Sequence, residues 1–300
     1  YGRLFYEYVR KLPNTIINLE ELIENKLKIY TEHSSSDINC NDKDDYPKLT
    51  FETKKKHLKL NSDLFKSIIN KTIYAASSNE ERPNLTGVNF KIENNILSCS
   101  ATDSYRIAVK KIKINDRLDE DVNIIVPAKN LIELTKILEN NVEDIEIHIF
   151  SNSVLFKINE LSFVSRLING NFPEVENIIP KKFEMVVKVK LDDFFDAIDR
   201  TSLLSKEESK QTVNLKLIEN KLILKAIIPE IGKVEEEIMV ENPEKGKIDI
   251  SFSSRYMLDA LRSLKSEKIV LSFVNEVAPI TVHSEEEEDY IQLFQAIRTY

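Results

Sequence analysis

The sequence predicts an α+β fold made of repeated units, each a helix followed by a β-sheet. Three observations lead to this prediction. An amphipathic helical pattern occurs three times, and its closing residues Leu12, Leu138 and Leu264 are 126 residues apart in both intervals (138 − 12 and 264 − 138). Short asparagine-containing turns recur between alternating apolar segments. Each helical segment is followed by segments with the alternation of β-strands.

The helices are predicted from apolar residues at helical spacing in five segments, 2–12, 63–77, 128–138, 193–204 and 254–264. The starts of successive segments are 61, 65, 65 and 61 residues apart. This interval is close to half of the 126-residue period. The spacing therefore predicts that each domain consists of two similar halves.

The strands are predicted from the segments between the helices. The motifs IENKL at 23–27, IENNI at 92–96 and IENKL at 218–222 predict hairpins, with Asn25-Lys26, Asn94-Asn95 and Asn220-Lys221 in tight turns. Asparagine adopts the left-handed conformation of such turns at little cost. Apolar alternation at 123–128, 143–158, 213–227 and 268–274 predicts further strands. Each half-unit is therefore expected to contain one helix and about four strands.

Five half-units are recognisable, whereas three domains of two halves need six. The chain starts with Tyr1-Gly2 instead of methionine, directly before a helix that matches the second half of a domain. We therefore expect about 60 residues, one half-unit, to precede it. The predicted domains are 1–52, as the second half of a first domain, then 53–182 and 183–300.

The composition argues against several classes of function. Hydrophobic residues make up 42% of the 300 residues, and no apolar run approaches the ~18 residues of a membrane span, so a cytoplasmic protein without membrane association is expected. The five glycines form no phosphate-binding loop, and common nucleophile and zinc-hydrolase motifs are absent. Cys40, Cys99 and the four histidines lack metal-ligand spacing. We expect no cofactor, no metal and no catalytic activity.

The three helices with the 126-residue spacing share charged residues at equivalent positions. Two basic residues lie seven apart on each helix with an acidic residue between them: Arg3, Glu7 and Arg10; Lys129, Glu133 and Lys136; Arg255, Asp259 and Arg262. One interpretation is an exposed face with its own ion pairs. The other is a basic face, kept in three domains of a chain with net charge −8, that surrounds a polyanion. Such a face would contact phosphates without reading bases, which predicts nonspecific binding to duplex DNA.

Three acidic runs, at 42–45, 235–237 and 285–289, lie outside the predicted helices. As solvated loops or edge strands they would keep the outer surface soluble and repel DNA from it. A sharper alternative is a metal-activated nuclease that uses Asp42, Asp44 and Asp45, or the 285–289 run. A third possibility is a repeat-built adaptor that does not act on DNA. Runs of adjacent residues rarely converge on one ion, which favours the first interpretation.

Four motifs resemble those of the β sliding clamp of bacterial DNA polymerase III, in the family's order: RPNLTGVNFKIENNILSCSATDSYRIAV at 82–109, SRLINGNFPEVENIIP at 165–180, ISFSSRYMLDALRSL at 250–264 and IQLFQAIRTY at 291–300. The resemblance covers essentially the whole chain, with the first half of the family's domain I missing before Tyr1. It implies a head-to-tail homodimer that forms a ring, with helices lining the interior around duplex DNA and β-sheets outside. It also implies a non-catalytic processivity factor that tethers the replicative polymerase, the clamp loader and repair proteins.

The resemblance also assigns a partner site, an apolar pocket between domains II and III that receives a short peptide with a glutamine and bulky apolar residues. Carried over residue by residue, the pocket consists of Leu85, Thr102, Ser104, Tyr105, Arg106, Ile107, Pro173, Asn177, Ile178, Leu293, Gln295, Ala296, Ile297 and Arg298. Two departures matter: Tyr105 replaces a common histidine, and Gln295-Ala296 replaces a large apolar residue followed by proline. Core packing is the alternative role of Leu85, Ile107 and Ile178.

Two further surfaces are expected. The residues predicted to face DNA are Arg3, Arg10, Arg82, Lys129, Lys136, Arg255 and Arg262. Leu203 and Leu204 end a helix before the polar segment SKEESKQ, and two adjacent leucines cannot both face one core stripe. The resemblance places dimer-interface residues here, so both are predicted to contact a second copy, with Ile38 as the counterpart.

Overall fold

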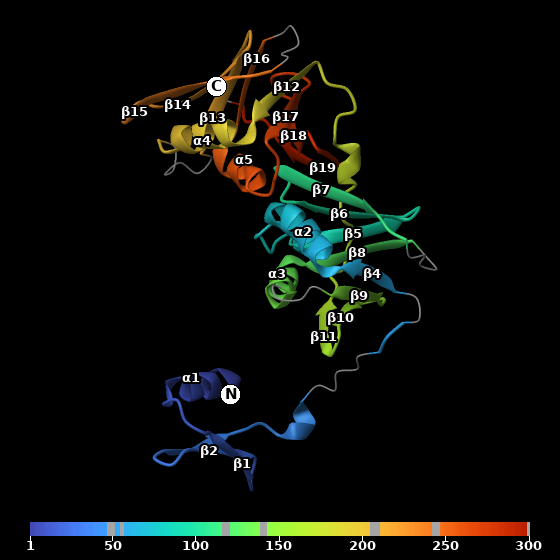
Figure 1. Cartoon of the computed structure of the whole chain (residues 1–300), viewed down its shortest axis with the longest axis vertical. Helices are drawn as coiled ribbons and strands as arrows, with labels where there is room; N and C mark the ends of the chain where they lie inside the picture. Colours follow the sequence, from blue (N-terminus) through green and yellow to red (C-terminus); the bar gives the residue numbers. More distant parts are fainter. Residues whose placement is uncertain are drawn as a thin grey trace. The chain divides into compact units, whose positions relative to one another are not determined.

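The computed structural model describes residues 1–46, 52–54, 57–115, 121–138, 143–204, 211–241 and 247–298. The last two residues of the C-terminal motif, Thr299 and Tyr300, lie outside this set. The chain forms two compact units, Tyr1–Glu52 and Thr53–Tyr300, and each is described by itself (Figure 1). Within the described ranges, no helix is long and apolar enough to cross a membrane.

The first unit consists of one helix and a small sheet. Helix α1 (Gly2–Lys11) precedes β1 (Asn18–Leu22), β2 (Lys26–Tyr30) and β3 (Ser35–Asn39), and the antiparallel sheet has the order β1-β2-β3. A 3-10 turn, η1 (Lys43–Asp45), follows. Ile29 and Ile38 are buried, whereas α1 buries none of its side chains. The apolar face of α1 is therefore only partly covered within this unit.

The second unit repeats one pattern four times, namely a strand, a helix and three more strands. The first copy contains β4 (Leu58–Asn61), α2 (Ser62–Thr72), β5 (Gly87–Glu93), β6 (Ile96–Thr102) and β7 (Arg106–Lys113). The second contains β8 (Val122–Pro127), α3 (Ala128–Ile137), β9 (Asp144–Ile149), β10 (Ser153–Ile158) and β11 (Leu161–Arg166). The third contains β12 (Met185–Lys190), α4 (Leu191–Ser202), β13 (Thr212–Ile218), β14 (Lys221–Ile228) and β15 (Gly232–Met239). The fourth contains β16 (Ile248–Ser253), α5 (Ser254–Leu261), β17 (Lys268–Phe273), β18 (Ile280–Ser284) and β19 (Glu287–Phe294).

All five predicted helices are confirmed, and each starts within two residues of its predicted position. Local chemistry explains where α2 begins. The side-chain oxygen of Asn61 accepts the backbone N–H groups of Asp63 (3.0 Å) and Leu64 (3.2 Å), which would otherwise lack partners in the first turn.

Two of the three predicted hairpin turns are displaced. Asn94 and Asn95 form the β5–β6 turn with positive φ angles, as predicted. The other two turns end at Asn25 and Asn220, so Lys26 and Lys221 begin the following strands. In these two hairpins Lys26 pairs with Leu22 and Lys221 pairs with Ile218, so neither lysine lies in the turn.

Neighbouring copies of the pattern exchange their first strands. The first strand of one copy joins the three strands of the next, which gives the sheet β11-β10-β9-β4 and, in the second pair of copies, places β12 beside β17–β19. The reciprocal exchange adds β8 to β5–β7 and gives the sheet β15-β14-β13-β16. Each pair of half-units is therefore interlocked.

The two remaining four-stranded groups join edge to edge in one eight-stranded sheet, β12-β17-β18-β19-β7-β6-β5-β8. The join, which we call the seam, pairs β7 with β19 antiparallel, from Arg106↔Phe294 to Lys110↔Tyr290. Helices α2–α5 lie along one side of this unit and the sheets along the other (Figure 1). The main hydrophobic core, which includes Phe65 and Phe252, is formed by residues of these helices and sheets. The predicted domain limits 1–52, 53–182 and 183–300 stay predictions.

Candidate partner-binding and DNA-facing surfaces

Along the two strands of the seam, successive side chains alternate between the two faces of the sheet. Ala108, Tyr290 and Phe294 belong to the main core, on the helix side of the sheet. Ile107 and Leu293, their neighbours along the same strands, belong to a second hydrophobic cluster. Because successive strand residues point to opposite faces, this second cluster lies on the outer face of the seam.

The outer-face cluster consists of Leu85, Ile107, Val109, Ile125, Phe172, Val175 and Leu293, with Ile168 and Ile179 packed against it. Its exposed rim includes Ile178, which is 52% exposed, and Tyr105, which is 59% exposed. A hollow of about 410 Å³ extends along the seam and is lined by apolar Val109, Ile179, Pro180 and Ile291, and by charged Lys111, Glu176, Lys181, Glu288 and Asp289. The outer face therefore combines an apolar floor with an accessible rim.

The predicted pocket residues occupy different positions in this site. Leu85, Ile107 and Leu293 are buried together in the cluster, so core packing is a real role of the first two. Ile178 is exposed, so core packing is not its role. Arg106 and Thr102 are buried, Ala296 and Ile297 are half-buried, and Ser104, Pro173, Asn177, Gln295 and Arg298 are exposed.

Two contacts bring predicted pocket segments together. The backbone N–H of Gln295 donates to the carbonyl oxygen of Tyr105 (2.9 Å), which fixes the C-terminal segment beside loop 102–106. The 3-10 turn η5 (Val175–Asn177) is tied to β7 by an ion pair between Glu176 and Lys111. This turn holds Ile178 at the rim.

The sequence interpretation missed four members of the cluster, namely Val109, Ile125, Phe172 and Val175. A signal was present for Val109, because it is two residues after Ile107 and so shares a strand face with it. Phe172 and Val175 flank Pro173 in an irregular segment without periodicity, so pattern alone could not assign them.

The predicted DNA-facing side chains are all exposed, but several are paired. Lys136 contacts Glu133 (2.7 Å) and Arg262 contacts Asp259 (3.1 Å), as the alternative ion-pair interpretation expected. Lys129 contacts Glu80 (2.9 Å), and Arg82 donates to Ser104 (3.1 Å). These contacts are exposed and therefore weak.

Helix α4 differs from the basic helices in its charge. It exposes Asp192, Asp193, Asp196 and Asp199, and its single arginine, Arg200, pairs with Glu236 at 2.9 Å. The helix side of the second unit is therefore not uniformly basic, and any contact with phosphates would concentrate at α3 and α5.

The predicted interface leucines are accessible, whereas their predicted counterpart is not. Leu203 is 56% exposed and Leu204 is half-buried, immediately after α4. Ile38 is only 7% exposed within the first unit, which leaves little of its side chain for a second copy to contact. Strand β3, which carries Ile38, is nevertheless an outer strand of its sheet, as β15 is of another.

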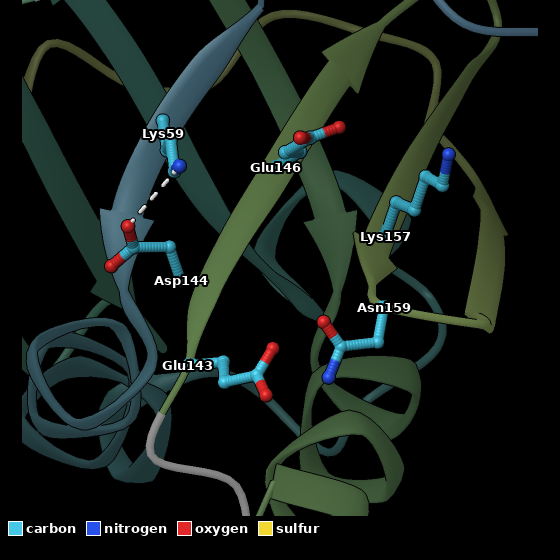
Figure 2. Close-up of a pocket in the computed structure, with 6 residues that line it drawn as sticks. All are labelled: Lys59, Glu143, Asp144, Glu146, Lys157 and Asn159. Carbon is cyan, nitrogen blue, oxygen red and sulfur yellow. Dashed lines mark ion pairs between the residues drawn. The ribbon is translucent and has the colours of Figure 1, made fainter.

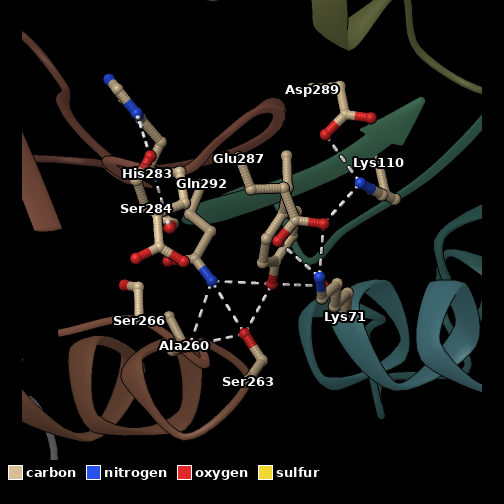
Figure 3. Close-up of polar contacts among 12 residues, drawn as sticks. Lys71, Lys110, Ala260, Ser263, Ser266, His283, Ser284, Glu287, Asp289 and Gln292 are labelled. Carbon is tan, nitrogen blue, oxygen red and sulfur yellow. Dashed lines mark hydrogen bonds and ion pairs between the residues drawn. The ribbon is translucent and has the colours of Figure 1, made fainter. Parts of the chain in front are cut away.

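The acidic runs are largely paired with basic side chains. Glu235, Glu236 and Glu237 contact Lys233, Arg200 and Lys221. In the 285–289 run, Glu285 contacts Lys188, while Glu287 and Asp289 contact Lys110 of β7 (Figure 3). Asp42 accepts the N–H of Asp44 (2.9 Å). No group of three or more potential metal ligands occurs among the residues with described positions.

A polar hollow of about 560 Å³ lies away from the seam, on the sheet that contains β4, β9 and β10 (Figure 2). It is lined by Lys59, Glu143, Asp144, Glu146, Lys157 and Asn159, and Lys59 pairs with Asp144 (3.3 Å). Its lining offers solvated charges of both signs and no apolar anchor. The outer face of the seam is therefore the better candidate for a binding site.

Comparison with known proteins points in one direction. The family model for the central domain of the DNA polymerase III beta subunit matches residues 59–174, and the model for its C-terminal domain matches residues 176–298. The beta sliding clamps of Staphylococcus aureus strain Mu50 and of Staphylococcus epidermidis are each 36% identical over 299 residues, covering 100% of this chain and 79% of those proteins. The sliding clamp structure from Bacillus subtilis is 37% identical, with a TM-score of 0.93 over 100% of this chain and 79% of that one. The Streptococcus pneumoniae beta chain is 31% identical, with a TM-score of 0.91 over 99% and 79%.

Proposed function

The chain belongs to the β sliding clamp family, the non-catalytic beta subunit and processivity factor of DNA polymerase III, and we propose that it holds partner proteins on duplex DNA through the outer face of the seam. The partners are expected to be the replicative polymerase, the clamp loader and repair proteins, each binding through a short peptide. The expected fold, an α+β clamp, is confirmed.

One observation carries the peptide-binding proposal, namely that the rim of the outer-face cluster is exposed to solvent. Leu85, Ile107 and Leu293 form its floor, while Ile178 and Tyr105 expose large apolar surfaces at its rim. A bulky apolar side chain of a peptide would bury this rim, and full burial of such a side chain is worth roughly 1.5–3 kcal/mol. An anchor in an apolar pocket with a few polar groups around it is the usual form of a peptide hot spot.

The DNA proposal is supported by the exposed basic residues on α1, α3 and α5. Arg3, Lys129 and Arg255 occupy equivalent helix positions, and all three are exposed. The carboxylates of α4 oppose such a contact locally, which favours weak and nonspecific binding. A ring closed by a second copy would retain DNA by topology, so weak contacts would suffice.

The proposed second copy would be held by Leu203 and Leu204 and by strand edges. β15 and β3 are outer strands, and an outer strand offers unpaired backbone groups to another chain. The acidic side chains of β15 are compatible with a basic partner surface such as Lys26 and Lys28 on β2. Homodimerisation by this route stays a proposal.

Neither alternative function has a comparable observation behind it. A nuclease would need free carboxylates that converge, whereas Glu285, Glu287 and Asp289 each contact a lysine. An adaptor that never meets DNA would not need exposed basic residues at equivalent positions of α1, α3 and α5.

Hydrogen–deuterium exchange with and without a short synthetic peptide tests the peptide-binding proposal. The peptide should contain glutamine, leucine and phenylalanine. We expect protection at residues 102–109, 172–179 and 291–298, because these segments form the outer face of the seam. Protection confined to other segments would place the partner site elsewhere.

A further inference from the structure

We propose that Asp259, on α5, is a positioning residue for the partner pocket: it holds the side chain of Arg106 and thereby fixes loop 102–106. The inference rests on the proposed peptide-binding role of the seam. Asp259 lies outside the pocket and acts from the opposite side of the seam. The sequence alone predicts Asp259 only as the acidic residue between Arg255 and Arg262 on its own helix.

Arg106 is the residue that Asp259 holds, and its environment is unusual for an arginine. Its side chain is 8% exposed. Nε contacts Asp103 Oδ2 (3.0 Å) and Nη1 contacts Asp259 Oδ2 (3.0 Å). The guanidinium also lies over the Tyr256 ring, with its central carbon 4.4 Å from the ring centroid. A buried guanidinium needs such partners, because burial removes its hydration.

The two carboxylates that contact Arg106 constrain loop 102–106 in different ways. Asp103 belongs to the same loop, and its Oδ1 accepts the N–H groups of Tyr105 (3.0 Å) and Arg106 (3.1 Å). This contact shapes the loop without tying it to anything else. Asp259 comes from α5, so among the residues that the structure describes only the Arg106–Asp259 pair fastens the loop across the seam by charge.

Loop 102–106 has an unusual backbone conformation that other contacts must hold in place. Ser104 has a φ angle of 79°, in the left-handed region that a side chain other than glycine or asparagine rarely occupies. Thr102 Oγ1 accepts the Ser104 N–H (3.1 Å) and donates to the Arg106 carbonyl oxygen (2.7 Å). These contacts form the turn. The contacts of the Arg106 side chain then set the direction in which the turn points.

The loop presents Tyr105 to the pocket rim, and α5 also supports that ring. Tyr105 and Tyr256 stack with 6.4 Å between ring centroids. The carbonyl oxygen of Tyr105 accepts the Gln295 N–H, so displacing the loop would also displace the C-terminal segment. A shift of the loop would therefore change two sides of the pocket together.

The equivalent acidic residue on α3 makes only part of this arrangement. Glu133 contacts Lys136 at 2.7 Å, as Asp259 contacts Arg262 at 3.1 Å. Asp259 uses its second oxygen for Arg106, a contact that has no counterpart for Glu133 within the described part of the chain. Since Arg262 is 58% exposed, its own pair with Asp259 contributes little.

Calorimetric titration of the same synthetic peptide against Asp259→Asn tests the inference. This variant keeps the shape of the side chain and removes its charge. We expect binding to weaken by about tenfold, a coupling typical of residues that share one charged network. Asp249→Asn is the matched control, because Asp249 also forms an ion pair in this part of the chain, with Lys216 at 2.7 Å, away from the seam. The control should bind the peptide like the unmodified chain.

A double-mutant cycle separates positioning from a general structural role. If Asp259 acts through Arg106, then Asp259→Asn should have no further effect on affinity in an Arg106→Met chain. Full additivity of the two effects, or unchanged affinity in Asp259→Asn despite a lower Tm, would overturn the inference. Asp259→Glu restores the charge and should recover part of the affinity.

One more variant distinguishes failure of this inference from failure of the proposed function. Ile178→Ala changes the exposed rim and leaves Arg106 and Asp259 in place. If Ile178→Ala weakens binding and Asp259→Asn does not, the pocket stands and the positioning role is wrong. If Ile178→Ala has no effect, the proposed pocket itself is wrong.

Discussion

Lys110 on β7 and Glu287 on β19 form an ion pair across the seam, with 2.5 Å between Nζ and Oε1 (Figure 3). Glu287 also contacts Lys71 on α2, and Asp289 contacts Lys110 at 2.7 Å. Burial would raise the pKa of Glu287, but hydrogen bonds from Lys110 and Lys71 outweigh burial and lower it. Charged groups of β7, β19 and α2 therefore meet at the Lys110 end of the seam.

We predict that Glu287→Gln lowers the free energy of unfolding at pH 7 by about 2 kcal/mol, because it leaves Lys110 buried with one carboxylate fewer. A lowered folded-state pKa means that the carboxylate stabilises the fold above its unfolded pKa, about 4.3, and that this stabilisation disappears as pH falls through the folded-state pKa. Urea unfolding of both proteins at pH 7 and near pH 3 measures the difference. It should shrink at the lower pH.

Glu288→Gln is the matched control for this prediction. Glu288 is adjacent to Glu287 and exposed. Its substitution should change stability by less than about 0.5 kcal/mol at either pH. A destabilisation as large as that of Glu287→Gln would mean that the effect reflects net charge and not the ion pairs of the seam.

The repeat could be predicted from the sequence because helical and strand periodicities are local patterns. Helical spacing located all five helices, and the near-equal intervals predicted half-units. The exchange of first strands was not predicted, because a strand such as β4 pairs with β9 more than 80 residues later and carries no local sign of its partner. The same limit applies to Asp259, whose contact with Arg106 joins residues 153 positions apart.

The candidate site was predicted from the resemblance and not from the residues alone. Leu85 and Ile107 have the pattern of core residues, and they are indeed buried. What makes the site a pocket is the exposed rim, and exposure of Ile178 in an irregular segment has no sequence signature. The acidity of α4 is readable in LDDFFDAIDRTS, but α4 is not among the three helices with the 126-residue spacing from which the DNA-facing side chains are predicted.

For DNA, we predict that changing Lys129, Lys136, Arg255 and Arg262 to glutamine flattens the dependence of log K on log salt concentration. The slope should fall by about 0.9 for each phosphate that the variant no longer neutralises. Fluorescence anisotropy with a labelled duplex at several salt concentrations measures it. As a control away from the helices, Lys221 and Lys233, which lie on β14 and β15, can be changed to glutamine. Equal slopes for the two variants would show that the four basic residues of α3 and α5 do not contact DNA.

For self-association, we predict that Leu203→Ala with Leu204→Ala shifts the protein from dimer toward monomer. Each buried apolar side chain contributes roughly 1–3 kcal/mol to such an interface. Sedimentation equilibrium gives the dissociation constant. Val277→Ala is the control, because Val277 is equally exposed but lies in the β17–β18 connection. An unchanged constant in the double variant would move the interface elsewhere.

For the pocket, we predict that Gln295→Leu with Ala296→Pro tightens binding of the synthetic peptide. Burying the Gln295 amide requires a compensating hydrogen bond, whereas leucine only packs. Proline restricts the segment before binding, and the Ala296 N–H donates no hydrogen bond within the described residues that proline would remove. Titration calorimetry of the two chains gives both affinities. Weaker binding by the double variant would show that the peptide uses the Gln295 amide.

The most direct test of the central claim is the affinity of the synthetic peptide for Ile178→Ala, measured by titration calorimetry against the unmodified chain. Ile178 is 52% exposed, so its truncation should hardly affect folding, unlike that of the buried Leu85. If the outer face of the seam binds partner peptides, Ile178→Ala should weaken binding by ~1–2 kcal/mol, while Val277→Ala should not. Equal affinity of Ile178→Ala and the unmodified chain would contradict the claim that this face is the partner site.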